Sequence, residues 1–128
     1  MSKVYNIYWD EGNKWISMDW DGYATSAQFI EGTELMYKLK REHNASKVLA
    51  DIKDMTLIGR EDQDYTVHSF LPRAIESGFR AIAIVKPLSY FNAVAVETIG
   101  YRIKDTVIQM RVFDNRDEAF TWLKSLDF

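Results

Sequence analysis

The sequence predicts an α/β fold built on a single-layer mixed sheet, and three features indicate it. Two short apolar runs, 47–52 and 79–86, flank a segment with helical periodicity, which is typical of parallel strands joined by a crossover helix. Two aromatic-rich segments before them flank a Gly/Asn turn and predict a hairpin. Helical and strand patterns alternate again afterwards. The predicted order is ββαβαβαβα, in one domain over residues 1–128.

The hairpin is predicted from strands over residues 4–9 and 14–20, where aromatic and β-branched side chains are frequent. The first helix is expected to begin after Thr25. A threonine followed three residues later by Gln28 is a capping-box pattern, in which each residue satisfies a backbone amide of the first turn.

Gly32 lies on the apolar face of this first helix. A glycine costs a helix about 1 kcal/mol, so we expect close packing against the sheet to compensate for it. On the solvent face, Glu34 and Lys38 are one turn apart, a spacing that predicts an ion pair.

The crossover helix is expected to begin in the acidic run 61–64, where carboxylates complement the free amides of a first turn. Pro72 lies inside its apolar stripe and predicts a kink or a break near Leu71. Gly78 suits the left-handed position that ends a helix.

Three further elements complete the chain. Ser89 is expected to cap the third helix. A strand over 106–113 carries Gln109 and Arg111 on one face and is therefore expected near a sheet edge. Asn115 is expected to cap the last helix.

Composition disfavours several functional classes. The net charge is −3 and no basic tract is present, which argues against nucleic-acid binding because that affinity comes mainly from neutralising phosphates. The absence of cysteine excludes disulfides and thiolate chemistry. No apolar run approaches the roughly 20 residues of a membrane span, and no secretory signal is present. We therefore expect a cytoplasmic protein.

Motifs for catalysis or cofactor binding are also missing. His43 and His68 are far apart, and neither has a second histidine at helical spacing. No Gly-rich nucleophile elbow and no phosphate-binding loop is present. The acids between residues 51 and 64 could serve magnesium binding or acid/base chemistry, but a helix start favours acids anyway. We expect no enzymatic activity, no metal and no cofactor.

A binding surface is expected where the strands end, because open α/β sheets dock ligands and partners at the carboxyl ends of their strands. The candidate partner-binding residues follow or end the central strand. They are Asp51, Asp54, Thr56, Arg60, Glu61 and Asp62.

A second candidate surface comes from the hairpin, which is crowded with aromatic side chains. In alternating strands about half of them must point away from the core. The candidates for an apolar ligand pocket or a dimer face are Tyr8, Trp9, Trp15 and Trp20. The alternative interpretation is that helices cover most of them.

The element order, the strand-end Asp51 with its loop to Asp62, and the ending with Phe113, Glu118-Ala119 and Trp122-Leu123 resemble a known family. The chain is similar to the STAS domains of anti-sigma-factor antagonists, which have the SpoIIAA-like fold, and to bacterial STAS/SEC14-like proteins. The resemblance implies a non-catalytic module for protein–protein interaction or regulation in the bacterial cytoplasm, with a protein partner. Homodimerisation is expected separately, from the exposed aromatic residues of the hairpin. An alternative that the resemblance implies is a carrier of a small apolar molecule or lipid, of the SEC14-like kind.

In signalling members of the family, a serine in the turn after the central strand is phosphorylated. The matching positions here are Gly59, Arg60, Glu61 and Asp62, so the acceptor serine is absent. A carboxylate at Glu61 carries less charge and fewer acceptor atoms than a phosphate. Thr56 is a hydroxyl in the same loop, outside the matching positions.

Overall fold

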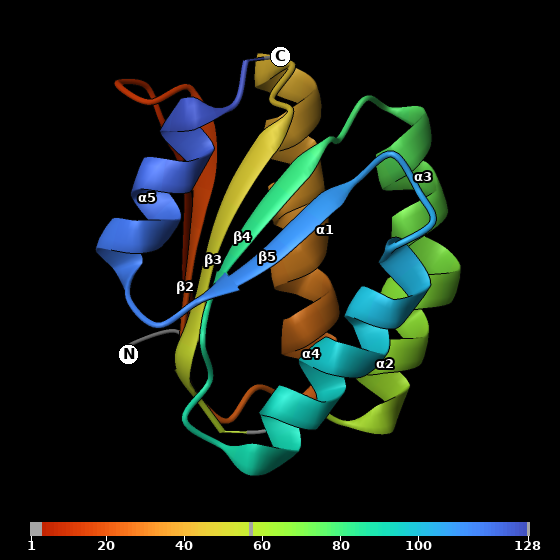
Figure 1. The fold of residues 1–128 in the computed structure, drawn as a ribbon. Coiled ribbons are helices and arrows are strands. Elements are labelled where there is room, and N and C mark those ends of the chain that lie inside the picture. The colour runs from red at the N-terminus through yellow and green to blue at the C-terminus, as the bar shows by residue number, and fades with distance from the viewer. Residues whose placement is uncertain (1–3, 57, 128) are drawn as a thin grey trace.

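A five-stranded mixed sheet forms the centre of the protein in a computed structural model, which describes residues 4–56 and 58–127 (Figure 1). The strands are β1 (Tyr5–Asp10), β2 (Trp15–Gly22), β3 (Lys47–Met55), β4 (Ala81–Val85) and β5 (Gln109–Phe113). The helices are α1 (Ser26–His43), α2 (Arg60–Tyr65), the π-helix η1 (Thr66–Phe70), α3 (Leu71–Glu76), α4 (Tyr90–Ile103) and α5 (Arg116–Ser125). The predicted order is confirmed, because α2, η1 and α3 follow one another without a gap and act as one helical segment.

The topology explains how the helices divide between the two faces of the sheet. The strands lie in chain order, β1 to β5, and only β1 and β2 are antiparallel. Each later crossover connection leads to the next strand position, always in the same direction across the sheet. Since such crossovers are right-handed, α1, the α2–η1–α3 segment and α4 all cover one face. Helix α5 follows the last strand and covers the opposite face (Figure 1).

Strand β3 is longer than expected and contains an irregularity. It runs to Met55, so Asp51 and Asp54 belong to the strand and not to the loop after it. Its pairing with β2 shifts by one residue between Asp51 and Asp54, which is the signature of a β-bulge. The bulge turns both Ile52 and Met55 towards the face covered by α1 and α4.

The sequence signals for helix ends are confirmed. Thr25 and Gln28 form both bonds of the capping box. Gly78 adopts a φ of +98°, in the left-handed region that glycine tolerates. Pro72 is the second residue after η1, so the predicted irregularity near Leu71 takes the form of a π-turn.

Two predictions about α1 have different outcomes. A Cβ atom on Gly32 would lie 2.6 Å from the indole of Trp20, so the close packing expected there is confirmed. The predicted Glu34–Lys38 pair is wrong, because Glu34 pairs with Arg73 of α3 and Lys38 lies 3.9 Å from Glu42. The guanidinium of Arg73 offers Glu34 two parallel hydrogen bonds, a better match than one flexible amine.

Candidate functional site

Four of the six candidate partner-binding residues lie together at one end of the sheet. Asp54, Thr56, Arg60 and Glu61 surround the connection from β3 to α2, and all four are exposed. The Thr56 amide donates to the Gly22 carbonyl at 2.9 Å, which ties the connection to the end of β2. The four side chains therefore form an exposed strand-end surface on a fixed backbone.

Asp51 does not belong to this surface. Its carboxylate lies 3.2 Å from Nη1 of Arg116, on the face covered by α5, and the same guanidinium pairs with Asp19 at 2.5 Å. Burial alone would lower the pKa of Arg116, but its hydrogen bond with Asp19 and the nearby carboxylates raise it. Asp51 alternates with Ala50 and shares the α5 face with Leu49, so its carboxylate lies apart from the other candidate residues.

Asp62 is also misplaced by the sequence prediction. Its side chain is buried, with 4% of the residue exposed, although it was expected to face a partner. The Oδ1 atom has no hydrogen-bond partner among the described residues. The expectation failed because the third residue of this short helix turns inwards against α1 and α4, which α2 contacts.

Asn92 of α4 fixes the connection between β3 and α2 through hydrogen bonds. This residue of α4 is fully buried; its Nδ2 donates to the Met55 carbonyl and its Oδ1 accepts from the Ile58 amide, both at 2.7 Å. The side-chain amide thus pairs with the backbone on both sides of Thr56, as a neighbouring strand would. Asn92 fixes the strand-end surface to α4.

The hairpin aromatics do not form one patch. Trp15 is 1% exposed and packs under α5, so the pocket or dimer-face prediction is wrong for it. Trp9 stacks on His43 of α1 with parallel rings 4.3 Å apart. Tyr8 is 39% exposed on the face opposite to Trp9. Alternation along the strands separates these side chains onto two faces, and Trp20 alone among the four lines an apolar cavity.

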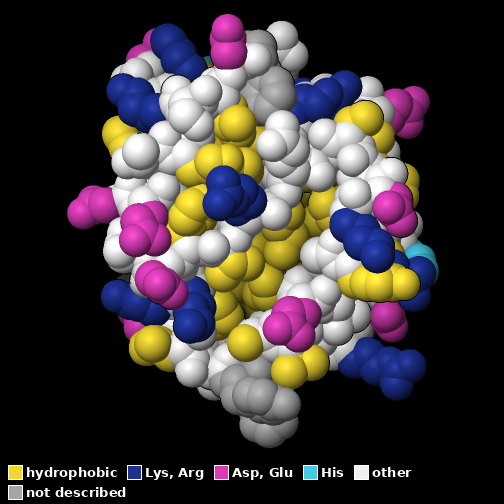
Figure 2. Space-filling model, viewed as in Figure 1, with side chains coloured by type: hydrophobic (Ala, Val, Ile, Leu, Met, Phe, Trp, Pro, Cys, Tyr) yellow, Lys and Arg dark blue, Asp and Glu magenta, His cyan; other side chains and the backbone are white. Residues whose placement is uncertain are grey.

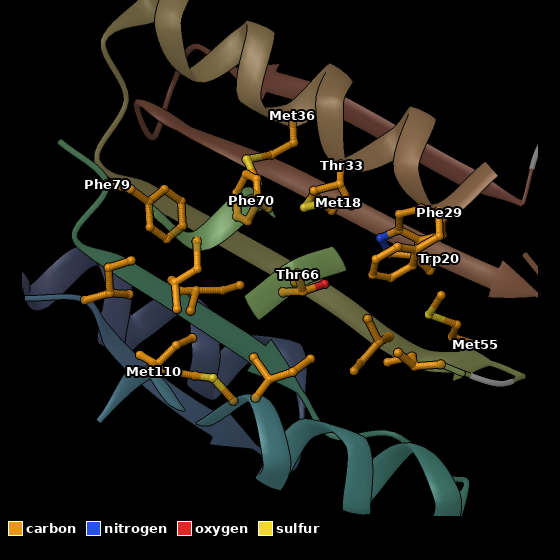
Figure 3. Close-up of a pocket in the computed structure, with 18 residues that line it drawn as sticks. Met18, Trp20, Phe29, Thr33, Met36, Met55, Thr66, Phe70, Phe79 and Met110 are labelled. Carbon is orange, nitrogen blue, oxygen red and sulfur yellow. The ribbon is translucent and has the colours of Figure 1, made fainter. Parts of the chain in front are cut away.

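The face of the sheet that α1, the α2–η1–α3 segment and α4 cover is called the larger face here. The cavity lies between the sheet and the helices of this face, and eighteen residues line it (Figure 3). None of the lining residues is charged, and only Thr33, Thr66 and the indole nitrogen of Trp20 bring polar side-chain atoms. All four methionines of the described chain line it, namely Met18, Met36, Met55 and Met110. Methionine side chains are flexible and adapt to irregular spaces.

The cavity volume is about 120 Å³. In Figure 2, hydrophobic side chains gather at the bottom of a hollow in the middle of the molecule, in the same view as Figure 1. Edge strand β5 borders this region with α3 and α4 in Figure 1, and Met110 and Ile103 from β5 and α4 line the cavity. We identify the hollow as the mouth of the cavity.

A polar cluster on the outer surface connects the helices that cover the cavity. Arg73 of α3 donates two hydrogen bonds to Glu34 of α1, and the hydroxyl of Tyr65 of α2 donates to the same carboxylate. The Arg73 hydrogen bond holds the pKa of Glu34 below its ordinary value. Burial, followed by the hydrogen bond with Glu34, raises the pKa of Tyr65 to about 12. This cluster fastens α2 and α3 to α1.

Sequence reasoning missed Thr33, Thr66 and Asn92. A weak signal existed for each, because all three are polar residues within apolar helical stripes. The described residues contain no cluster of three or more histidines and acids that could hold a metal ion. None of their helices combines the length and apolar content that a membrane span requires.

Comparisons with known proteins show the fold and the family. A crystal structure of an uncharacterised protein of the DUF3478 family from Shewanella loihica PV-4, described as having a SpoIIAA-like fold, superposes with a TM-score of 0.64 at 16% sequence identity. The match covers 96% of this chain and 98% of the other. No curated protein matches significantly. The SpoIIAA-like family model matches residues 15–124, and the chain therefore belongs to the SpoIIAA-like family.

Proposed function

We propose that the protein binds a small apolar molecule in the cavity beneath α1, η1, α3 and α4, and acts as a non-catalytic carrier or sensor. The observation that carries the proposal is the uncharged, almost wholly apolar lining of the cavity. A well-packed core leaves few voids larger than a water molecule, so a space of this size between sheet and helices is unusual.

The volume of about 120 Å³ suits a benzene-sized body. An engineered protein cavity of about 150 Å³ with a similar lining stays dry and binds benzene. A longer ligand, such as an acyl chain, requires the helices to move outwards or the methionines to change rotamer. The four methionines are suited to such adjustment.

Toluene titration tests this proposal. Ligand that binds only the folded state raises its stability, by about 2.7 kcal/mol at a hundredfold excess over Kd. We expect the melting temperature to rise with toluene, and methyl resonances of lining residues such as Ile52 and Ile103 to shift. In the Ala50→Ile variant, which fills the cavity from β3, both effects should disappear. An unchanged melting temperature and unchanged methyl shifts would refute the proposal.

A second function, protein–protein interaction, is supported by a separate observation. Asp54, Thr56, Arg60 and Glu61 expose alternating charges and a hydroxyl around a backbone that Asn92 and Gly22 hold in place. Preordered surfaces lose little entropy on binding. We propose that a protein partner in the bacterial cytoplasm docks on this strand-end surface, and that Thr56 is the available hydroxyl for modification.

Charge reversal tests the second function. The variants Asp54→Lys, Arg60→Glu and Glu61→Lys should abolish cross-linking to a partner in cells, whereas Glu97→Lys on the exposed side of α4 should not. Retention of the same cross-links in all variants would contradict it.

Homodimerisation through the hairpin stays a prediction, now reduced to Tyr8 and Trp9. Sedimentation of the Tyr8→Ser variant checks it.

A further inference from the structure

Thr33 differs from the other threonines that lie in helices. The hydroxyls of Thr66, Thr98 and Thr121 donate to the carbonyl four residues earlier, at 2.8, 3.0 and 3.0 Å. The hydroxyl of Thr33, in the middle of α1, forms no hydrogen bond with any described residue, although Thr33 is only 6% exposed. Local back-bonding is the usual solution for a buried helical threonine, and Thr33 does not use it.

The Thr33 hydroxyl lies against the cavity. Among the described residues, the one fully enclosed side-chain oxygen without a hydrogen bond is Oδ1 of Asp62. The unbonded hydroxyl of Thr33 must therefore border open space, and the open space that this buried residue lines is the cavity (Figure 3). An apolar space offers no water to satisfy it, so the hydroxyl is left for a bound molecule.

Thr66 supplies a hydrogen-bond acceptor on another wall of the same cavity. Its side chain lines the same cavity from η1, and its proton is used in the bond to the Asp62 carbonyl. A hydroxyl has one donor and two acceptor lone pairs, so Thr66 can only accept from a ligand, whereas Thr33 can also donate. A ligand that satisfies both must donate and accept, which a hydroxyl group does.

Charge on the ligand is disfavoured. No lysine, arginine or histidine lines the cavity. Moving a carboxylate into an apolar space without a partner costs far more than moving a neutral hydroxyl. Fatty acids can therefore occupy the cavity with their chain but not with their head group.

We infer that the cavity selects neutral molecules with a benzene-sized apolar body and one hydroxyl group, that is, small alcohols or phenols, recognised by Thr33 and Thr66. This inference rests on the proposed apolar-ligand function and adds the ligand class. It also assigns a polar role to two residues of an otherwise apolar lining.

Three probes of similar size test the inference: toluene, phenol, in which a hydroxyl replaces the methyl group, and benzoate. Dissociation constants follow from shifts of lining methyl groups in methyl-labelled protein. We expect phenol to bind at least as tightly as toluene and benzoate to be undetectable. Phenol binding that is tenfold or more weaker than toluene binding would overturn the inference, as would benzoate binding equal to that of phenol.

A matched pair of variants separates recognition from folding. Thr33→Val keeps the side-chain shape and removes the hydroxyl; it should weaken phenol binding about tenfold and leave toluene binding unchanged, because a buried donor or acceptor loses its partner. Thr98→Val, on the exposed side of α4, should change neither. Equal phenol binding in Thr33→Val and wild type would overturn the inference. Absence of toluene and phenol binding in the wild type would instead refute the proposed function itself.

Discussion

The two faces of the sheet are packed in different ways, although they share the same strands. On the α5 face, Ala81, Ala83 and Ala119 are fully buried and allow helix and sheet to approach closely. Lys47 donates to the carbonyls of Leu123 and Leu126 at 2.7 Å and so holds the end of α5. On the larger face, bulky and flexible side chains leave a cavity. Whether space remains for a ligand therefore depends on the side chains that strands and helices present to each face, and not on the backbone of the sheet.

The largest expected effect separates the two faces directly. Leu123→Ala removes a fully buried side chain from the α5 face, whereas Leu71→Ala enlarges an existing cavity. We expect Leu123→Ala to lower the free energy of unfolding by about 4 kcal/mol and Leu71→Ala by about 2 kcal/mol, since a lining residue has fewer contacts to lose. Urea unfolding measures both. Equal losses would show that the larger face is as tightly packed as the α5 face.

The next effect concerns Asn92, whose side chain links α4 to the connection between β3 and α2. Asn92→Ala leaves the Ile58 amide and the Met55 carbonyl without their buried partner, so we expect a loss of about 3 kcal/mol in unfolding free energy. Hydrogen exchange at the Ile58 amide should accelerate together with this loss. Ser89→Ala removes only the cap of the same helix, and its cost should be about 1 kcal/mol. Similar costs for both variants would mean that Asn92 acts through α4 alone.

Two glycines in helices of the larger face differ in the space around them. A methyl group on Gly32 would collide with Trp20, whereas one on Gly100 would meet the flexible end of Met110 at 3.3 Å. We expect Gly32→Ala to destabilise the protein by about 2 kcal/mol, because the clash outweighs the gain in helix propensity. Gly100→Ala should stabilise it by about 0.5 kcal/mol. Thermal unfolding of both variants decides this, and a stabilising Gly32→Ala would contradict the close packing.

The smallest effect is the pH dependence of the stability that the polar cluster of Glu34, Tyr65 and Arg73 contributes. The pKa of Glu34 is lowered in the folded state, so its contribution is present above the ordinary carboxyl pKa and is lost as pH falls through the folded pKa. Because Glu34 and Arg73 are both more than a third exposed, we expect Glu34→Gln to cost at most about 1 kcal/mol at neutral pH. Unfolding measured from pH 7 to pH 3 should show the two proteins converging. A constant difference would argue against the ion pair as its source.

Local signals in the sequence predicted the fold well. The hairpin, the capping box at Thr25, the left-handed Gly78 and the irregularity before Pro72 each depend on residues within a few positions of one another. Hydrophobic periodicity predicted the alternation of strands and helices for the same reason. Such features are decided by short-range physics, which a single sequence displays.

The candidate site was predicted less well because its geometry depends on distant partners. Asp51 meets Arg116, which is 65 positions away, and Asn92 meets Ile58 across 34 positions. The burial of Asp62 depends on how α2 lies against its neighbours. The cavity is a mismatch between whole surfaces, and no residue pattern of one segment displays such a mismatch.

The π-turn at Thr66–Phe70 also limits how this segment can vary among relatives. A π-turn holds one residue more than a regular α-helix requires. Because this one turn absorbs the extra residue, the helical residues after it keep the faces that they would have in a regular helix. Deleting one residue there should therefore leave Arg73 facing Glu34 and change only the side chains of the turn itself, of which Thr66 and Phe70 line the cavity. A relative without this extra residue should therefore keep the fold but carry a different set of side chains at this wall of its cavity, and with it a different choice of ligand.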